Sequence, residues 1–508
     1  MFRPLAARAG STTKPEGAAE TMATAIPTNE VEFTLGVLAD VCGGTLVGAD
    51  AAAVTRGVST DTRTIAKDSL FVALRGERVD GHDFVDGALE KGALCAVVAK
   101  NTGPFRGPHI VVDDTLVALG IIARTALRRA RTARLLPVLA VGGAAGKTTT
   151  KELAAASVSA LWGSTLATKG NLNNLIGAPM TLLSLLDEHR AVVAEVGTNA
   201  HGEIARLGAI VEPDVALVLN VDNEHTEGLE SLEAVAREEG ALFAAIRDVA
   251  GSAAVGNLEE PYSFGQIDRR PKSTRKLCFG EGEGADVRLV SRKPTVEGRS
   301  KLSLRVAGTL TQSRAPFDCE ISLGLLGPGP AIDAAAALCA TLALLGRGAS
   351  EGEIVRAAKA MESVKPVSGR LVPFALASGA LVIDDTYNAN PRSVRASSDA
   401  AFELAALRGG RVHVLLGDML ELGALGPSLH AEVVAHVEQG APKSFVGVGP
   451  LMRAALGARW SAANTPEDAA DLVRSSVAPA DVVLVKGSRG IRMERAVVAL
   501  CANASTVA

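Results

Sequence analysis

Residues 136–150 read Leu-Pro-Val-Leu-Ala-Val-Gly-Gly-Ala-Ala-Gly-Lys-Thr-Thr-Thr. The run before the glycines predicts a buried strand, and the residues that follow, Lys151 to Leu161, predict a helix. Further apolar runs at 191–196 and 215–221 also predict strands. Strands without apolar–polar alternation are typical of parallel sheets that helices cover on both faces. The sequence therefore predicts an α/β fold around a central parallel sheet.

The glycine-rich turn between that strand and helix predicts a phosphate-binding loop. Its glycines let backbone N–H groups face a triphosphate, and the start of the helix adds a favourable dipole. The lysine would reach the β- and γ-phosphates, and the first threonine would offer its hydroxyl to Mg²⁺. A chance turn before a helix is the alternative, which the strand–turn–helix context disfavours. The candidate nucleotide-binding residues of the loop are Gly143, Gly146, Lys147, Thr148 and Thr149.

Changes of pattern along the chain predict three domains after an N-terminal tail. Residues 1–30 are rich in Ala, Thr, Pro and Gly and are expected to be disordered. Residues 31–134, where short β-rich runs alternate with glycine-containing turns, predict a small α/β domain. Residues 135–362 form the central P-loop-type domain. Residues 363–508 carry a second strand–helix series and predict a Rossmann-like α/β domain.

The composition limits the classes of function. The chain has 508 residues, 47% of them hydrophobic and 21% charged, with a formal net charge of −4. Since no basic excess exists to neutralise phosphates, neither a general nucleic-acid binder nor a membrane-surface protein is expected. The six cysteines form no C-x-x-C pair, which favours buried thiols in a reducing compartment. We expect a cytoplasmic protein that is not inserted in a membrane.

Four segments besides the loop carry a family resemblance. They are Thr-Lys-Gly-Asn-Leu-Asn-Asn at 168–174, Asp-Asp-Thr-Tyr-Asn-Ala-Asn-Pro at 384–391, Leu-Gly-Asp-Met-Leu-Glu-Leu-Gly at 416–423 and Lys-Gly-Ser-Arg-Gly at 486–490. With them, the chain resembles the Mur ligases, which join amino acids to a UDP-sugar-linked peptide using ATP. The second and third segments are the most specific, and they resemble the branch that adds D-alanyl-D-alanine. The resemblance runs from about residue 33 to 500.

This resemblance implies ATP and Mg²⁺ as cofactors, and UDP-N-acetylmuramoyl-tripeptide and D-Ala-D-Ala as substrates. Amide formation needs an activated carboxylate, so ATP is expected to phosphorylate the peptide's terminal carboxylate before the dipeptide's amine attacks it. Both steps concentrate negative charge, which cations stabilise. By resemblance, the catalytic residues are Lys147, Glu195, His225 and Arg370, and the metal ligands are Thr148, Glu195 and His225. A strand-end glutamate is otherwise often a helix cap, and a lone histidine is more often structural.

The remaining site residues also follow from the resemblance. The small first domain, 31–134, is expected to bind the UDP-sugar, and the third domain the incoming dipeptide. Nucleotide contacts are expected from Asn257, Asp384 and Asn388, and substrate contacts from Ser59, Asp61, Arg63, Asn173, Asn174, Asn390, Lys486 and Arg489. A turn for Asn-Ala-Asn-Pro and a solvated basic turn around Lys486 are the alternatives. A monomer is expected.

Three departures from the family pattern stand out. Glu239 occupies the place of a lysine that is often carbamylated, and we hypothesise that its carboxylate stands in for the carbamate near Mg²⁺. The adenine-contacting Gly-x-His-Asn-x-x-Asn stretch reads Gly-Pro-Gly-Pro-Ala-Ile-Asp at 327–333, so adenine recognition must differ. The expected Asn-x-Asp-Asp turn reads Asn-Leu-Glu-Glu at 257–260. The phosphate loop stays intact, which favours an active enzyme.

Two other functions stay open on the sequence alone. One is a sister ligase that adds a single amino acid, or a polyglutamate-type ligase. The other is a non-catalytic nucleotide-binding protein on the same fold, which the missing adenine-contacting residues favour. The specific segments at 384–391 and 416–423 argue for the dipeptide-adding branch.

Overall fold

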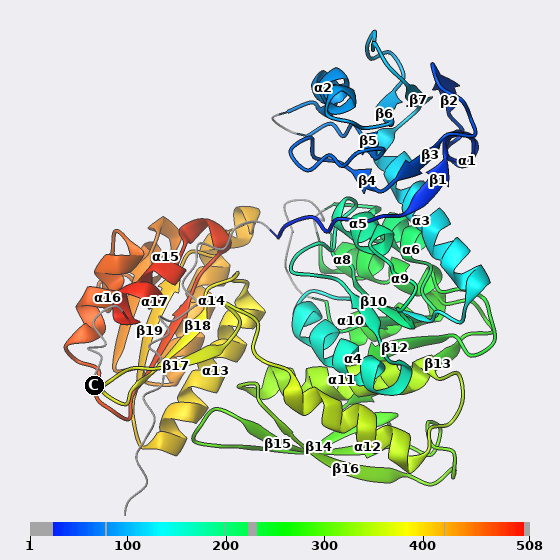
Figure 1. The fold of residues 1–508 in the computed structure, drawn as a ribbon. Helices are drawn as coiled ribbons and strands as arrows, with labels where there is room; N and C mark the ends of the chain where they lie inside the picture. Colours follow the sequence, from blue (N-terminus) through cyan, green and yellow to red (C-terminus); the bar gives the residue numbers. More distant parts are fainter. Residues whose placement is uncertain (1–23, 77–78, 199, 222–230, 421, 502–508) are drawn as a thin grey trace, which may run out of the picture.

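The computed structural model describes residues 24–76, 79–198, 200–221, 231–420 and 422–501. These residues form three domains, which follow one another in the order of the sequence (Figure 1). Mostly parallel sheets with helices packed on them make up the two larger domains. The prediction of a three-domain α/β fold is confirmed.

The N-terminal domain carries a five-stranded sheet in the order β2-β7-β6-β5-β4, beside a two-stranded ladder of β1 and β3. Helix α1 begins after Thr34, whose hydroxyl accepts a hydrogen bond from the Val37 amide, and ends at Gly43 in the left-handed conformation. Its elements are β1 (Glu32–Thr34), α1 (Leu35–Cys42), β2 (Thr45–Val47), β3 (Val54–Arg56), β4 (Val58–Ser59), β5 (Leu70–Val72), the 3₁₀ helix η1 (Gly81–Phe84), α2 (Val85–Glu90), β6 (Cys95–Ala99) and β7 (His109–Val112).

Part of the segment that the sequence assigns to a disordered tail is held on this domain. The side chain of Asn29 donates a hydrogen bond of 2.9 Å to the Val58 carbonyl and accepts one of 2.8 Å from the Val58 amide. The amide side chain thus pairs with both backbone groups of one residue. Composition alone predicts disorder here because it contains no information on such a contact. Residues 1–23 of the expected tail lie outside the described residues.

The central domain is built on a nine-stranded sheet in the order β16-β15-β14-β13-β12-β11-β8-β10-β9. Pairing is parallel from β9 through β14, and β14, β15 and β16 extend the sheet in antiparallel fashion. The strands are β8 (Val138–Gly142), β9 (Thr165–Ala167), β10 (Ala191–Glu195), β11 (Val215–Val218), β12 (Ala253–Asn257), β13 (Arg275–Gly280), β14 (Val287–Pro294), β15 (Ser300–Val306) and β16 (Phe317–Leu323).

Helices cover both faces of the central sheet. Helix α11 is apolar on nearly every side and is buried between α4, α12 and the sheet, as a helix without a polar face must be. The helices are α4 (Lys147–Trp162), α5 (Gly177–Leu183), α6 (Glu203–Val211), α8 (Leu232–Glu239), α9 (Ala241–Ala244), α10 (Pro261–Gly265), η2 (Ile267–Arg269), α11 (Pro328–Leu344), α12 (Glu351–Ala360) and η3 (Met361–Ser363).

A long helix, α3 (Thr115–Ala133), joins the first two domains. It contacts α1 on one side and α5 and α6 on the other (Figure 1). Buried residues of α3, including Leu119 and Leu127, lie in a single apolar cluster with Leu70 of the N-terminal sheet and Val192 of the central sheet. The N-terminal and central domains therefore share one hydrophobic core.

The C-terminal domain has a six-stranded sheet in the order β17-β18-β22-β19-β20-β21, parallel except for the β17–β18 pair. Its strands are β17 (Val372–Ala375), β18 (Leu381–Asp385), β19 (Val412–Gly417), β20 (Ser444–Val448), β21 (Ser461–Ala463) and β22 (Val482–Lys486). Its helices are α13 (Pro391–Arg408), η4 (Gly423–Leu425), α14 (Gly426–Gln439), α15 (Pro450–Leu456), α16 (Pro466–Arg474), η5 (Arg489–Ile491) and α17 (Glu494–Cys501).

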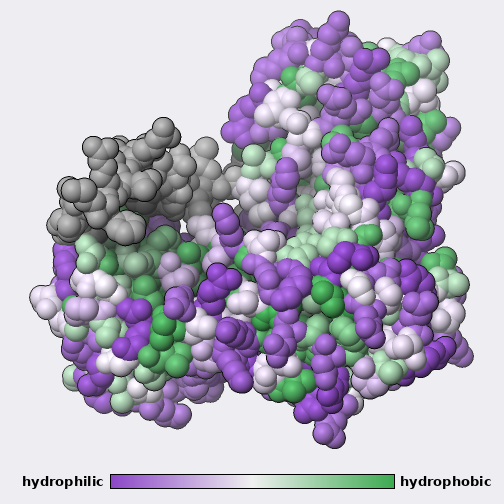
Figure 2. All heavy atoms as spheres, turned by 60° about the horizontal axis from the view of Figure 1, so that its bottom comes forward, coloured by the Kyte–Doolittle hydropathy of each residue, from purple (hydrophilic) through white to green (hydrophobic). Residues whose placement is uncertain are grey.

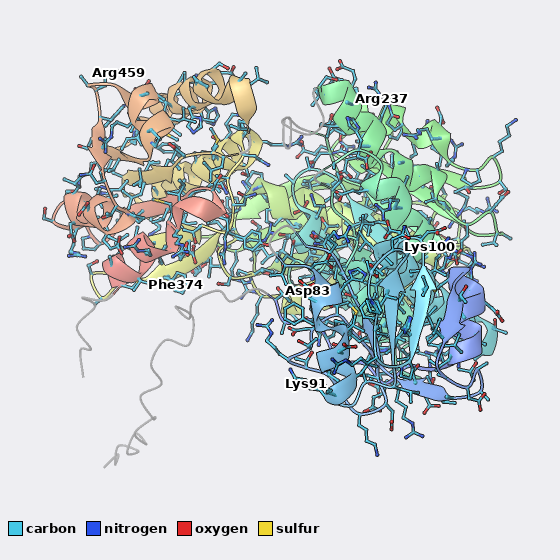
Figure 3. All side chains as sticks on the ribbon, turned by 90° about the horizontal axis from the view of Figure 1, so that it is seen from above. Asp83, Lys91, Lys100, Arg237, Phe374 and Arg459 are labelled. Atoms are coloured by element: carbon cyan, nitrogen blue, oxygen red, sulfur yellow. The ribbon has the colours of Figure 1, made fainter. Side chains whose placement is uncertain are left out.

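Seen from above, the N-terminal domain, with Asp83, Lys91 and Lys100, overlies the central domain, and the C-terminal domain, with Phe374 and Arg459, lies to one side (Figure 3). On the face shown in Figure 2, hydrophilic residues predominate and hydrophobic ones form small separate groups. No helix within the described ranges is long and apolar enough to cross a bilayer.

Candidate active site

The phosphate loop lies at the carboxyl end of β8, as the sequence predicts. Gly143 and Gly146 adopt positive φ angles of 119° and 88°, which side chains rarely tolerate. Lys147 opens α4 and folds back over the loop, donating hydrogen bonds to the Gly143 carbonyl and, at 3.1 Å, to the Ala144 carbonyl. The ammonium therefore lies at the loop where the phosphates are expected to bind.

Asn220, at the carboxyl end of the neighbouring strand, fixes the loop from the side. Its side-chain oxygen accepts a hydrogen bond of 2.8 Å from the Ala145 amide, and its side-chain nitrogen donates one of 2.8 Å to the Ala145 carbonyl. Sequence reasoning missed this residue. The available signal was a polar residue directly after the apolar run of β11, beside the loop strand in the sheet.

Glu195 lies at the end of β10, opposite the start of α4. Its Oε1 accepts hydrogen bonds of 3.2 Å from the Thr148 hydroxyl and 2.8 Å from the Asn173 amide. Its Oε2 is buried and has no hydrogen-bond partner among the described residues. Three of the predicted residues, Thr148, Asn173 and Glu195, are thus brought together, and one carboxylate oxygen remains to be satisfied.

Asn174 sits beside them but has a local role. Its side-chain oxygen accepts hydrogen bonds of 2.8 Å from the Gly177 amide and 3.1 Å from the Ile176 amide. These amides open α5, whose first N–H groups lack partners within the helix. The contact explains why an asparagine stands here without invoking a substrate, although Asn174 also lines the cavity described below.

Glu239 contacts the phosphate loop directly. It is buried at the end of α8, and its Oε2 accepts a hydrogen bond of 2.7 Å from the Gly143 amide. This geometry gives the carboxylate a part in holding the loop, and its role as a metal ligand stays a prediction. His225, the other residue expected near the metal, lies outside the described residues.

The altered stretch at 327–333 places Asp333 against the loop. A Cβ added at Gly146 would lie 2.6 Å from Asp333 Oδ1, so the carboxyl occupies the space that the glycine leaves open. Burial raises the pKa of Asp333 to about 8, although Thr150 and the guanidinium groups of Arg392 and Arg370 act in the opposite direction. Near neutral pH the group is therefore largely a neutral acid and can donate a hydrogen bond as the family's asparagine would.

We expect Asp333→Asn to flatten the pH dependence of stability. The folded protein retains this proton up to about pH 8, whereas the unfolded chain releases it near pH 4, so this group's contribution to stability is largest below pH 4 and falls until pH 8. The slope is on the order of 1 kcal/mol per pH unit from this one group. Urea unfolding of both proteins at pH 5 and pH 8 measures it. Parallel changes in the two proteins would show that Asp333 is already ionised.

The C-terminal domain contributes an arginine stacked on an aromatic ring. The Arg370 guanidinium lies 4.3 Å from the centre of the Tyr387 ring, and that of Arg489 lies 5.7 Å from the same ring. Stacking of this kind orients a guanidinium without consuming its donors. The Nε of Arg370 is buried and has no hydrogen-bond partner in the described part of the chain. Arg370 is therefore held ready for an acceptor.

Lys486 is engaged in a buried ion pair. Its ammonium lies 2.6 Å from Asp385 Oδ2 and donates a hydrogen bond of 2.8 Å to the Asn388 carbonyl. The side chains of Lys486 and Asp385 are 3% and 10% exposed. The sequence suggests that Lys486 binds the dipeptide's carboxylate. In the structure its ammonium is paired with Asp385, so we assign Lys486 first to stabilising the turn after β18.

Three further predicted residues make local hydrogen bonds, two of them at strand ends and one at the start of a helix. Asp384 Oδ1 accepts a hydrogen bond of 2.6 Å from the Thr386 hydroxyl, and burial raises the pKa of Asp384. Asn390 caps α13 by accepting a hydrogen bond of 2.8 Å from the Ser393 amide. Asn257 Oδ1 accepts one of 3.1 Å from the Glu259 amide.

A cavity of about 490 Å³ lies between the central and C-terminal domains. It joins the phosphate loop and Glu195 to the turn after β18 and the start of α13. The predicted residues that line it are Gly146, Lys147, Thr148, Thr149, Asn173, Asn174, Glu195, Arg370, Asn388, Asn390 and Lys486. Asn257, Asp384 and Arg489 are not among its lining residues.

The residues expected to bind the UDP-sugar form a separate group on the N-terminal domain. Arg63 pairs with Asp61 at 2.6 Å, and the amide of Asp61 donates a hydrogen bond of 3.1 Å to the Ser59 hydroxyl. Hydrogen bonding from Arg63 lowers the pKa of Asp61. The Arg63 side chain is 86% exposed, so the group is open to a ligand from solvent.

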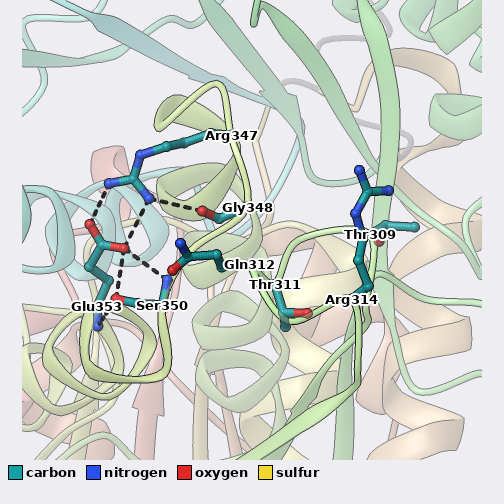
Figure 4. A pocket seen from close by; sticks show the side chains of 8 residues that line it. All are labelled: Thr309, Thr311, Gln312, Arg314, Arg347, Gly348, Ser350 and Glu353. Atoms are coloured by element: carbon teal, nitrogen blue, oxygen red, sulfur yellow. Dashed lines mark hydrogen bonds and ion pairs between the residues drawn. The ribbon is translucent and has the colours of Figure 1, made fainter.

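A second hollow, of about 530 Å³, lies at the antiparallel edge of the central domain (Figure 4). Arg347 on its wall is paired with Glu353 at 2.6 Å, and Glu353 also accepts hydrogen bonds from Ser350. None of the residues predicted for the site line this hollow. The cavity at the phosphate loop is therefore the candidate active site.

Comparison with known proteins covers nearly the whole chain. Three family models match: the Mur ligase family catalytic domain at residues 54–158, the Mur ligase middle domain at 141–341, and the Mur ligase glutamate ligase domain at 369–489. The UDP-N-acetylmuramoyl-tripeptide–D-alanyl-D-alanine ligase of Escherichia coli is 34% identical over 479 residues, which are 93% of this chain and 99% of that protein.

The chain belongs to the Mur ligase family. It is an ATP-dependent ligase that forms amide bonds, and the resemblance seen in the sequence is confirmed. The Mycobacterium tuberculosis protein of the same name is 30% identical over 525 residues, covering 93% of this chain and 98% of that protein.

Solved Mur ligase structures agree with this assignment. MurF of Acinetobacter baumannii superposes with a TM-score of 0.81 at 28% identity, covering 93% of this chain and all of that one. The MurF ligase of Thermotoga maritima, in complex with ADP, gives a TM-score of 0.74 at 26% identity over 87% of this chain and 96% of that one.

Proposed function

We propose that this chain joins D-alanyl-D-alanine to UDP-N-acetylmuramoyl-tripeptide with conversion of ATP to ADP and phosphate. The observation that carries the proposal is the shared cavity, in which the phosphate loop and Glu195 of one domain face Arg370 and Asn388 of another. Relatives that match almost end to end carry the name of this reaction. The reaction belongs to peptidoglycan precursor synthesis, and we place it in the cytoplasm with a monomeric enzyme.

Mg²⁺ is the proposed metal cofactor, and the residues present fit it. The Thr148 hydroxyl and the Glu195 carboxylate are hard oxygen donors in mutual contact, and Glu195 Oε2 is buried without a partner among the described residues. Mg²⁺ prefers such donors and completes its coordination with water and phosphate oxygens. Bound there, the ion would neutralise charge on the transferred phosphoryl group. We also propose His225 as a ligand.

The chain's own residues can then be given roles. Loop amides and Lys147 hold the β- and γ-phosphates, and Arg370 approaches the γ-phosphate from the opposite wall. The phosphoryl group passes to the tripeptide's terminal carboxylate, and the resulting acyl phosphate is attacked by the dipeptide's amine with release of phosphate. Negative charge builds up on the phosphoryl group in the first step and on the carbonyl oxygen and departing phosphate in the second, so the cations on the two walls supply most of the stabilisation.

We divide the work among the domains as the sequence suggests. Residues 31–134 bind the UDP-sugar through the group of Ser59, Asp61 and Arg63, residues 135–362 bind ATP, and residues 363–508 bind the dipeptide. The exposure of Arg63 and its position outside the lining of the cavity at the phosphate loop support a separate site for the uridine end of the substrate.

Stepwise omission of components tests the function. Purified protein is given ATP, Mg²⁺, UDP-N-acetylmuramoyl-tripeptide and D-Ala-D-Ala, and ADP release is followed with each one left out in turn. We expect ADP only when all are present. The third residue of the tripeptide can be one diamino acid or another, so both kinds of tripeptide are supplied. No turnover with either tripeptide would refute the proposal. ADP release with a single amino acid in place of the dipeptide would point instead to a sister ligase.

Variants of Glu239 separate its contact with the loop from metal binding. Glutamine keeps an acceptor oxygen for the Gly143 amide but has no charge, so we expect Glu239→Gln to keep its KM for ATP and to require more Mg²⁺. Glu239→Ala removes the acceptor and should raise the KM for ATP about tenfold. Mg²⁺ titrations of ADP release measure both. A higher Mg²⁺ requirement in the glutamine variant would indicate that the carboxylate serves the metal.

A further inference from the structure

One wall of the cavity is poor in polar side chains. Gly329, Pro330 and Ile332 line it at the start of α11 and have no side-chain donor or acceptor, whereas Asp333, which follows them, lies against Gly146 of the phosphate loop. Prolines 328 and 330 also lack backbone N–H groups. A nucleotide bound at the phosphate loop therefore needs polar contacts from elsewhere in the cavity lining.

Arg392 lines the same cavity from the C-terminal domain. It is the second residue of α13, whose start is fixed by Asn390 as cap, by Pro391 and by a reciprocal hydrogen bond with Ser393. A cation at the start of a helix is opposed by the helix dipole. Helix stability therefore does not explain an arginine here, and residues that break a local rule often serve a site.

The guanidinium of Arg392 is oriented across the domain boundary. Its Nη1 lies 3.1 Å from Glu260 Oε2 of the central domain, and the two side chains are 40% and 14% exposed. Glu260 belongs to the turn that departs from the family pattern at 257–260. One nitrogen of the guanidinium thus holds the half-buried carboxylate, and a guanidinium has further donors to offer.

The position of Arg392 relative to the loop also suits a nucleotide. Its charge acts on the Asp333 carboxyl, as does that of Arg370, and Asp333 lies against Gly146 of the phosphate loop. We propose that Arg392 binds the nucleotide in this ligase and that Glu260 holds it in position. A guanidinium donates to phosphate and ribose oxygens and stacks on a purine ring, so it supplies what the Gly329–Ile332 wall lacks. The inference rests on the ATP site proposed above.

A second ion pair between the same two domains provides a matched control. Arg292 of β14 pairs with Glu403, which lies further along α13, and neither residue lines the cavity. Both pairs tie α13 to the central domain, but only Arg392 faces the nucleotide site. An effect confined to Arg392 therefore reports nucleotide contact, and an effect common to both pairs reports domain association.

The test measures ADP binding by calorimetry and the KM for ATP in the full-length protein. We expect Arg392→Ala to raise both about tenfold, with the KM for D-Ala-D-Ala unchanged, and Glu260→Gln to raise both by a smaller factor. Arg392→Lys keeps the charge but not the planar fork, so its ADP affinity and its KM for ATP should lie between those of the wild type and those of Arg392→Ala. Arg292→Ala should leave ADP affinity within about twofold, since it touches only domain association. Unfolding curves confirm that each variant is folded.

Equal losses of ADP affinity in Arg392→Ala and Arg292→Ala would overturn the proposal, as would an unchanged ADP affinity in Arg392→Ala. Because ADP binding needs no turnover, this measurement decides on Arg392 even if the wild-type protein fails to join the proposed substrates. Binding of inorganic tripolyphosphate places the contact: affinity kept in Arg392→Ala locates it on the nucleoside, and affinity lost locates it on the phosphates.

Discussion

Replacing Lys147 by alanine is expected to lower the rate of ADP release by roughly a hundred- to a thousandfold. Lys147 is the cation at the start of α4, and in the structure its ammonium already contacts the carbonyls of the phosphate loop. Charge on the transferred phosphoryl group grows in the transition state, so a fixed cation there acts on the rate more than on binding. Initial rates at saturating ATP measure the effect.

An exposed lysine serves as the control for this variant. Lys100, on the N-terminal domain, pairs with Asp113 in solvent, and its side chain is 64% exposed. Lys100→Ala should leave the rate within about twofold, because exposed pairs of this kind contribute little. If Lys147→Ala kept a tenth or more of the wild-type rate, the loop would not be the site of phosphoryl transfer.

Replacing Lys486 by methionine is expected to destabilise the C-terminal domain by about 3–5 kcal/mol. Methionine fills nearly the same volume, but it leaves the Asp385 carboxylate buried without its cation. Urea unfolding followed by tryptophan fluorescence measures the change. Trp460 packs against Phe445 within this domain, and a Trp162→Phe background removes the signal of the other tryptophan in the chain.

Two comparisons make the result specific. Adding Asp385→Asn to Lys486→Met should recover part of the loss, because the unpaired buried charge is then gone. Arg495→Ala breaks an ion pair in the same domain whose side chains are 51% and 39% exposed, and it should cost less than about 1 kcal/mol. A loss for Lys486→Met no larger than that for Arg495→Ala would mean that the pair is hydrated.

Much of the fold could be predicted because apolar runs and glycine turns are local signals. The runs at 191–196 and 215–221 contain β10 and β11, and the phosphate loop lies where its glycines indicate. The chemistry of the loop could be predicted for the same reason, since the loop, the preceding strand and the following helix are contiguous in sequence.

Contacts between distant segments could not be predicted in this way. The pairing of Lys486 with Asp385 depends on β18 and β22 being neighbours in the sheet, which neither strand reveals by itself. Likewise, Asp333 reaches Gly146 only because α11 begins beside the loop. The sequence shows that the usual asparagine is absent, but the structure is needed to show that its replacement is buried, which raises the pKa of that carboxyl.

The core shared by the first two domains has a mechanical consequence. Sliding the N-terminal domain over the central one would expose apolar side chains from α3 and both sheets, so the two should travel as one body. The C-terminal domain meets that body across the cavity and through the ion pairs of α13. We therefore expect the exchange of ADP for ATP to require rotation of the C-terminal domain alone. The UDP-sugar end of the acceptor should stay bound to the N-terminal domain during that rotation.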